Sequence, residues 1–245
     1  MRESEEADRE IRSRTRRSLL TGAAAALAGG AGWNWLRTRR DDDGVRWPLR
    51  LALRANEQAS RDFFRETRLA RTFRASAAEP GRPNGEIGLE EPAGNDWSLR
   101  VESSGEDDRV LSLAEIRALP QVEMTTELKC IEGWSRILHW RGARFRDFVE
   151  RYAPAARAQE YVGMATPDGE YYIGLDMASA LHPQTLLCHE MNGKPLEEQH
   201  GAPLRLVIPV KYGIKNLKRI GRIWFAQTRP ADYWAERGYD WYAGF

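Results

Sequence analysis

The chain has 245 residues, 42% of them apolar and 10% aromatic, which is enough for one sizeable folded domain plus an extension. Its two cysteines are too few for a small domain held together by disulfides. The net charge is only +1, and residues 41–245 hold 28 basic against 31 acidic side chains. Such a weakly acidic body lacks the clustered basic face that phosphate-backbone binding needs, so the composition argues against nucleic acid as a partner.

Residues 1–40 have the layout of an export signal. Arg16 and Arg17 stand directly before Ser18, a small and apolar stretch follows, and Ala-Leu-Ala at 26–28 offers a cleavage site. This layout predicts export by the twin-arginine route to the periplasm, or to another extracytoplasmic location, of a protein that often already carries its cofactor.

Two alternatives to a cleaved signal stay open. The alternating arginines and acids of residues 1–17 also suit a solvated helix. Residues 18–36 form an uncharged run of 19, close to the roughly 20 that span a bilayer, so a retained membrane anchor is the second alternative. Trp33 and Trp35, followed by three arginines, favour seating at a membrane surface.

Residues 41–95 read as an N-terminal extension. Residues 41–44 form a polar hinge, and the spacing of the apolar positions predicts a helix over 49–74. Residues 78–95 are rich in proline and glycine, which predicts irregular structure.

Residues 96–245 read as one α+β domain, mostly β with short helices. Trp97, Leu99 and Val101 alternate with polar residues, which indicates a strand. The predicted helices cover 112–119, with Ser112 as the cap, and 145–152. The predicted strands cover 97–102, 124–128, 161–165, 170–173, 204–210 and 220–225, the third and fourth of them forming a hairpin around Pro167 to Gly169.

Cys130 stands at the end of the predicted strand 124–128, followed closely by Gly133 and Trp134. A cysteine at the end of a strand, beside a glycine turn, suits a single thiolate ligand for a metal. Taken alone, a cysteine is more often a small buried apolar residue. Cys188, within an apolar run, fits that second description better.

Between Arg205 and Arg222 there are six basic residues and no acidic one. Glycine and asparagine interrupt the run, which follows a strand of buried character. Cations beside exposed backbone N–H groups at a glycine turn form an anion site. The alternative is a solvated basic edge.

Three segments together resemble the sulfite-oxidase family of molybdenum-pterin oxidoreductases. They are Lys-Cys-Ile-Glu-Gly-Trp-Ser at 129–135, His-Gly-Ala-Pro-Leu-Arg-Leu-Val-Ile-Pro at 200–209 and Lys-Tyr-Gly-Ile-Lys-Asn-Leu-Lys at 211–218. Their order and spacing agree with the family over residues 97–228. The resemblance implies the family's fold and a molybdenum bound to a pterin, with one metal per chain; no haem-binding segment is visible.

The resemblance also implies roles for individual residues. Cys130 would bind the molybdenum, and Tyr212 would act as a catalytic residue lining the substrate channel. The residues implied to contact the pterin are Asn84, Thr166, His200, Arg205, Lys215, Asn216, Leu217 and Lys218. For Asn84 a plain Asn-Gly turn stays open, and for Thr166 a turn position before Pro167.

The implied activity is two-electron oxygen-atom transfer, with reduction of a small sulfoxide-type substrate ahead of oxidation of a small oxyanion such as sulfite. Electrons would come from an external redox partner, either a membrane quinol or cytochrome or a soluble cytochrome. A different alternative is a cofactor-free binding module in which Cys130 and Cys188 form a disulfide. The aromatic residues of 234–245 either cover the pocket or pack on the body.

Overall fold

The computed structural model describes residues 2–42, 45–90, 94, 96–102 and 108–245. The chain divides into two compact units, the first ending at Ala52 and the second running from Leu53 to Phe245. The division falls inside helix α2, Trp47–Phe63.

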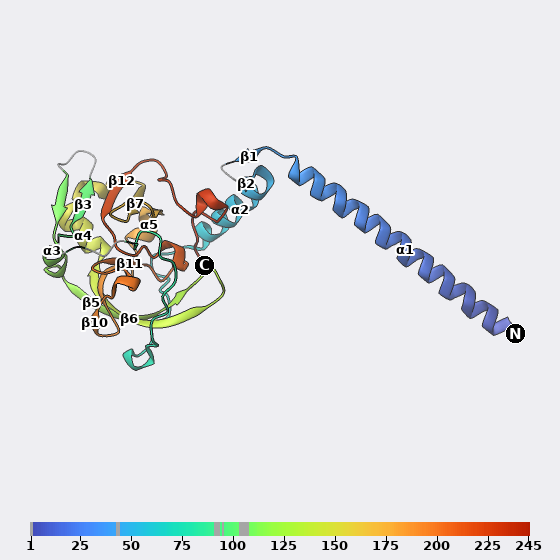
Figure 1. Cartoon of the computed structure of the whole chain (residues 1–245), viewed down its shortest axis with the longest axis horizontal. Coiled ribbons are helices and arrows are strands. Elements are labelled where there is room, and N and C mark those ends of the chain that lie inside the picture. Colours follow the sequence, from blue (N-terminus) through green and yellow to red (C-terminus); the bar gives the residue numbers. More distant parts are fainter. Residues whose placement is uncertain (1, 43–44, 91–93, 95, 103–107) are drawn as a thin grey trace. The chain divides into compact units, whose positions relative to one another are not determined.

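The first unit holds one long helix, α1, Arg2–Arg37, drawn in blue in Figure 1. Arg16 and Arg17 are both exposed on it. Two short antiparallel strands follow, β1 at Asp41–Asp42 and β2 at Val45–Arg46; residues 43–44 of the predicted hinge lie outside the described residues. Within the described part of the chain, no helix combines the length and the apolar character needed to cross a membrane.

The predicted helix over 49–74 is wrong at its C-terminal end, because α2 stops at Phe63. Residues 64–74 instead form a turn at 66–67 and then meet the edge of a sheet at Thr72. Thr72 pairs with Thr126, the Phe73 N–H donates to the Thr125 carbonyl at 3.0 Å, and Ala70 exchanges two hydrogen bonds with the Gln184 side chain. Sheet and side-chain partners therefore take the backbone groups that a longer helix would satisfy internally.

One sheet of the second unit has the strand order β10-β9-β6-β5, with β11 also paired to β9, all antiparallel. Its strands are β5 Gln121–Lys129, β6 Ser135–Arg144, β9 Leu186–Met191, β10 Lys194–Pro195 and β11 Arg205–Val207. The longest pairing, between β5 and β6, joins Gln121 to Ala143 at one end and Lys129 to Ser135 at the other.

The other sheet has the order β4-β3-β12-β7-β8 and is mixed, because β12 lies parallel to β3 and antiparallel to β7. Its strands are β3 Leu99–Glu102, β4 Arg109–Leu111, β7 Tyr161–Ala165, β8 Tyr172–Asp176 and β12 Arg222–Ala226. The predicted hairpin around residues 167–169 is confirmed as β7 and β8.

The helices of the second unit beyond α2 are short. They are α3 Leu113–Arg117, α4 Phe145–Tyr152 and α5 Met177–Ala180, with 3-10 helices at Ala75–Ala77, Pro154–Ala158, Glu198–His200, Gly213–Lys215 and Ala235–Arg237. The predicted cap of α3 is confirmed, because the Ser112 hydroxyl accepts from the Glu115 N–H while the Glu115 carboxylate accepts from the Ser112 N–H. The α+β prediction is confirmed.

The largest core cluster takes side chains from both sheets and from α4, so it holds the two sheets together. Phe145 and Phe148 of α4 stack within it with their ring centroids 5.7 Å apart. A second cluster packs between β6, β9 and β11 around Trp140, which is completely buried. This burial fixes the sheet whose loops carry the functional residues.

The predicted strand over 204–210 is shorter than expected, since β11 covers only Arg205–Val207. The Ile208 N–H donates to the Asn216 side chain at 2.9 Å rather than to a neighbouring strand, and the chain then turns at Pro209, which has no N–H to donate. This early turn carries residues 211–218 back alongside β11, where the Leu206 N–H donates to the Leu217 carbonyl at 2.8 Å.

Gly142 marks the register shift between β6 and β9. A Cβ at this position would lie 2.1 Å from the Leu187 carbonyl oxygen, so we expect Gly142→Ala to destabilise the second unit by about 1–3 kcal/mol. Urea unfolding followed by tryptophan fluorescence measures the change. Gly29→Ala, where a Cβ would meet nothing within 4 Å, is the control; equal midpoints for the two variants would contradict the packing argument.

Candidate cofactor site

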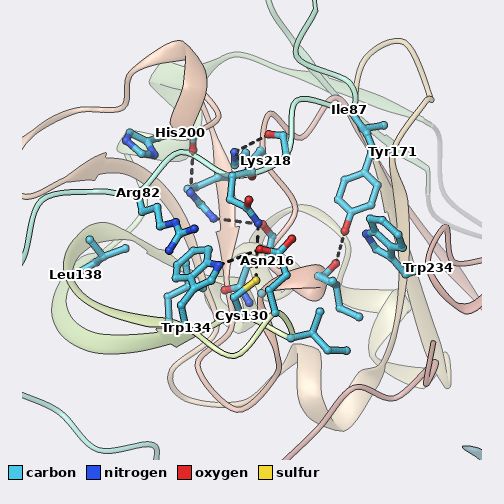
Figure 2. Close-up of a pocket in the computed structure, with 18 of the residues that line it drawn as sticks. Arg82, Ile87, Cys130, Trp134, Leu138, Tyr171, His200, Asn216, Lys218 and Trp234 are labelled. Atoms are coloured by element: carbon cyan, nitrogen blue, oxygen red, sulfur yellow. Dashed lines mark hydrogen bonds between the residues drawn. The ribbon is translucent and has the colours of Figure 1, made fainter.

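A cavity of about 150 Å³ opens in the second unit. Its walls come from stretches far apart in the sequence: residues 82–87, 128–138, 171, 191, 200–218 and 234–239. In Figure 2, Tyr171 and Trp234 lie on one side of this cavity and Arg82 and His200 on the other, with Cys130 between them. The cavity thus has an aromatic wall and a cationic wall.

Cys130 lies in the tight loop between β5 and β6. The strand pairing ends at Lys129 and Ser135, which leaves 130–134 as the loop. The Cys130 N–H donates to the Trp134 carbonyl at 2.9 Å, and the Gly133 N–H donates to the Cys130 carbonyl at 3.1 Å. These two bonds fix the backbone of Cys130, whose side chain is half-buried.

Two other segments approach this thiol. The Asn84 side-chain amide donates towards the Cys130 Sγ at 3.8 Å. Gly213 lies so close that a Cβ on it would be 3.4 Å from the Lys129 carbonyl oxygen and 3.6 Å from the Cys130 Cα. Burial raises the pKa of the Cys130 thiol above its ordinary value, and the positive charge of Arg82 acts in the opposite direction. The thiol therefore stays protonated until a cation binds it.

Neither cysteine forms a disulfide. Cys188 lies on β9, completely buried in the cluster around Trp140, and burial raises the pKa of its thiol. The predicted packing role of Cys188 is confirmed. The alternative of a Cys130–Cys188 bridge is wrong, because the second thiol is enclosed in the core while the first faces the cavity.

The six basic residues between 205 and 222 divide into two groups. Four of them have carboxylate partners: Lys211 with Asp176 at 3.5 Å, Lys215 with Asp232 at 2.5 Å, Arg219 with Glu198, and Arg222 with Glu102 at 2.6 Å. Arg205 and Lys218 have no ion pair with any described carboxylate. These two are the members of the run that line the cavity. The uncompensated charge is therefore concentrated at the cavity wall.

Arg205 is 4% exposed. Its guanidinium donates to the His200 carbonyl at 2.9 Å and to the Asn216 carbonyl at 3.3 Å, and it lies 4.9 Å from the centre of the Trp140 ring. Its Nε has no hydrogen-bond partner. A buried donor without an acceptor is costly, so this guanidinium is positioned to bind an added anion.

Lys218 donates from Nζ to three backbone carbonyls, those of Asn84, Gly85 and Gln199, at 2.8, 3.0 and 2.8 Å. It thereby ties the 84–85 segment to the segment carrying His200. Gly201 packs against it, since a Cβ there would lie 2.7 Å from the Lys218 Cβ. The ammonium is held in place by neutral dipoles, which leaves its charge available to a ligand.

Burial and the charge of Arg205 lower the pKa values of the other basic side chains on this wall. Burial lowers the pKa of Arg205 to about 10. Burial, and then the charge of Arg205, lowers the pKa of Lys218 to about 8. Burial also lowers the pKa of His200, with further lowering by the charges of Arg205 and Lys218. An anion between them would reverse these shifts, so the wall suits a phosphate or another oxyanion.

The cavity brings together six of the residues singled out in the sequence. They are Asn84, Cys130, His200, Arg205, Asn216 and Lys218. Asn216 is fixed by its own side chain, which accepts from the Ile208 N–H at 2.9 Å and donates to the Tyr212 carbonyl at 3.1 Å.

Four of the singled-out residues do not line the cavity. Lys215 is completely buried and donates to Asp232 and to the Gly174 carbonyl. Leu217 belongs to the main core. The Thr166 hydroxyl donates to Asp168 at 2.5 Å and accepts from the Tyr171 N–H at 3.1 Å, within the turn between β7 and β8. The Tyr212 ring packs against Phe245, with the centroids 5.0 Å apart.

Sequence reasoning missed several residues of the cavity wall, Arg82, Tyr171 and Met191 among them. The Arg82 guanidinium lies over the Trp134 ring, 4.7 Å from its centre. The Tyr171 hydroxyl donates to the Ile214 carbonyl at 2.5 Å, and Met191 closes the wall near His200. None of the three carries a local motif.

The aromatic residues of 234–245 divide between the two predicted roles, since Trp234 and Tyr239 line the cavity and Trp241 and Tyr242 pack in a core cluster.

The fold and the cavity define a protein that holds an anionic cofactor beside a free thiol. Residues 87–234, more than half of the chain, match the family described as oxidoreductase molybdopterin binding domain. The chain belongs to this family, as the resemblance in the sequence predicted.

Three relatives show which members of the family the chain is similar to. A putative protein-methionine-sulfoxide reductase subunit, YedZ1, of Azospira oryzae is 41% identical over 149 residues, covering 60% of this chain and 56% of the relative. The protein-methionine-sulfoxide reductase catalytic subunit MsrP of Xanthomonas campestris is 37% identical over 152 residues, 56% of this chain and 47% of its own length. MsrP of Burkholderia mallei is 29% identical over 238 residues, 89% and 71% respectively. The chain thus spans about half the length of the first two.

Among solved structures, the sulfane dehydrogenase SoxCD of Paracoccus pantotrophus is similar, with a TM-score of 0.52 and 16% identity over 58% of this chain and 41% of that one. At this identity the similarity supports the sulfite-oxidase-like fold alone.

The residues of the cavity fit the family's molybdopterin cofactor. A thiol is a soft ligand of the kind that binds such metals, and Cys130 supplies one free thiol. The orphaned Arg205 Nε and the unpaired Lys218 supply charge for a phosphate.

The lowered pKa of Lys218 leads to a pH-dependent test of the cationic wall. Its ammonium is fully charged below about pH 8 and loses its proton above it, so affinity for sulfate should fall as pH rises through that value. We expect the cofactor-free protein to lose about tenfold in sulfate affinity by about pH 9, measured by calorimetry. Lys218→Met should bind weakly at every pH, whereas Lys194→Met, at an exposed lysine on β10, should behave like the wild type. A Lys218→Met protein that keeps the pH-dependent decline would refute the assignment.

Proposed function

We propose that this chain is an exported molybdenum-pterin oxidoreductase that reduces a sulfoxide-type substrate, with one molybdenum per chain bound through Cys130. The observation that supports it best is the meeting, in one cavity, of a free thiol with the two cations of the 205–222 run that lack carboxylate partners. The methionine-sulfoxide reductase relatives supply the reaction type.

In this proposal the bound cofactor supplies two-electron oxygen-atom transfer. Cys130 would be the protein ligand of the metal and would give up its proton on binding it. Arg205, Lys218 and His200 would hold the pterin phosphate, and the Asn84 and Asn216 amides would add neutral hydrogen bonds. Residues 96–245 form the cofactor-binding domain, preceded by the extension 41–95.

The other singled-out residues have supporting roles. Lys215 and Leu217 fix the turn that presents Asn216 and Lys218, because both are completely buried on either side of Asn216. Thr166 orients Tyr171 through the hydrogen bond to its backbone. Tyr212 acts on the site through its packing beside Gly213, which approaches Cys130.

The character of the cavity favours an organic sulfoxide over an inorganic oxyanion. The wall opposite the cations is built from Tyr171, Ile214, Trp234 and Tyr239. Such a wall provides dispersion contacts and sulfur–aromatic contacts for a thioether-like substrate. Sulfite has no apolar group to use it. Reduction consumes two electrons and two protons per sulfoxide and releases water, so an external donor is required, either a membrane quinol or cytochrome or a soluble cytochrome.

Export is supported by the position of the arginine pair. Arg16 and Arg17 lie exposed on α1, directly ahead of its small, apolar half. A receptor of the twin-arginine route can reach both guanidinium groups there. We therefore propose a periplasmic or other extracytoplasmic location.

The ligand assignment is tested by metal content. Protein purified from molybdenum-replete cells should contain about one molybdenum per chain, and Cys130→Ser should lose it, because an alcohol does not replace a soft thiolate. Cys188→Ala is the matched control and should keep the metal despite a loss of about 1–2 kcal/mol in stability from its small core cavity. Metal retained by Cys130→Ser would refute the role of this thiol, and a metal-free wild type would favour a cofactor-free binding module.

The direction of the reaction is tested by two assays on the same preparation. We expect methionine sulfoxide to be reduced with a reduced viologen as donor, at a rate at least about tenfold above sulfite oxidation with a ferric acceptor, because only the first substrate uses the aromatic wall. The opposite ratio would establish the sulfite-oxidase-like alternative, which the cationic wall alone also accommodates.

A further inference from the structure

Residues 240–245, called the strap below, lie against the segment that leads into the cation-bearing turn. Lys211 and Gly244 form an antiparallel bridge, and the Tyr212 N–H donates to the Ala243 carbonyl at 2.9 Å. Tyr242 is 3% exposed, with the Lys211 Nζ over its ring. The strap is therefore packed in place next to residues 211–213.

The strap contains a non-glycine residue in the left-handed region, Ala243, with φ of 46°. The Asp240 side chain holds this conformation by accepting from the Tyr242 N–H at 3.2 Å and the Ala243 N–H at 3.0 Å. An L residue adopts such a φ only where its surroundings impose it. The two hydrogen bonds to the Asp240 side chain therefore maintain the strained backbone at Ala243 and position the end of the strap.

That end is Phe245, whose ring contacts the residue before the cysteine loop and a residue of the segment that approaches this loop. It meets the Tyr212 ring edge-on at 5.0 Å, and the Lys129 Nζ lies 4.0 Å from its centre. Lys129 is the residue immediately before Cys130, and Tyr212 is the residue immediately before Gly213, which packs on the Cys130 backbone. One ring thus bridges the two segments that meet at Cys130.

Burial of apolar surface does not explain the position of this ring, because Phe245 is 52% exposed. Its contacts are instead directional, one cation–aromatic and one aromatic–aromatic. The strap also lies beyond residues 87–234, the part that matches the family.

We propose that Phe245 is a positioning residue that holds Lys129 and Tyr212 together and so fixes the orientation of the Cys130 thiol at the cavity. The proposal rests on the proposed function for its effect on catalysis, but the positioning itself can be measured without cofactor or turnover.

The test is alkylation of the cofactor-free protein by iodoacetamide at one fixed pH. Cys188 is completely buried, so labelling of the native protein reports on Cys130. We expect Phe245→Ala to raise the labelling rate at least about threefold, since freeing the loop exposes a half-buried thiol. Phe245→Tyr keeps the ring and should restore the wild-type rate.

Phe63→Ala is the matched control, because Phe63 is a phenylalanine with 70% exposure on the same groove as Phe245. It should leave the rate unchanged, and the urea midpoint should stay the same in all variants, which separates positioning from general destabilisation. Phe245→Leu, which preserves apolar bulk but not the ring, is expected to behave like Phe245→Ala.

With cofactor, Phe245→Ala should hold less molybdenum per chain and show a lower kcat at unchanged KM, because the substrate wall is untouched. Equal labelling rates in Phe245→Ala and wild type would overturn the proposal. A wild type without metal or sulfoxide reduction would overturn the proposed function, while the labelling comparison would still decide the role of Phe245.

Discussion

The site depends on positive charge buried without a protein counter-charge. Removing a guanidinium from water costs several kcal/mol when no partner is supplied, and Arg205 is 4% exposed with an unsatisfied Nε. The chain reduces this cost with carbonyl dipoles around Arg205 and Lys218 and with the face of Trp140, yet no described carboxylate pairs with either cation. A carboxylate would neutralise them permanently. Neutral dipoles hold the same cations in place while leaving their charge to a bound anion.

The neighbouring lysines illustrate the contrast. Lys215 is as deeply buried as Arg205, but Asp232 compensates it, and the pair joins the cation-bearing turn to the segment that carries Trp234. The basic residues between 205 and 222 therefore have two roles. Its paired members fasten the turn to the body, and its unpaired members present charge to the cavity. The site is stiff because its supporting charges are satisfied, and it has affinity for anions because its facing charges are not.

The sequence predicted the parts whose cause is local. The cap at Ser112, the helix Phe145–Tyr152 and the hairpin of β7 and β8 follow from propensity, capping and turn residues, and all were confirmed. The family motifs pointed to Cys130 and Arg205, which the cavity brings together. Local sequence patterns do not show which of these basic residues has a carboxylate partner. Lys215 and Lys218 look alike in the sequence, and only the tertiary position of Asp232, 17 residues away, separates them. The end of α2 was missed for the same reason, since Thr72 pairs with a strand more than 50 residues further on.

The residues of the cavity wall that lack a motif are the least local part of the site. Arg82, Tyr171 and Met191 come from an irregular segment, a strand entry and a strand end, and no motif links them. Their contacts are individual ones, such as the Arg82 guanidinium over the Trp134 ring and the Tyr171 hydroxyl bonded to the Ile214 carbonyl. Family membership therefore fixes the cofactor end of the cavity through a few strongly constrained positions. In the proposed function the wall opposite the cations would contact the substrate, so substrate preference depends on its side chains and not on the fold alone.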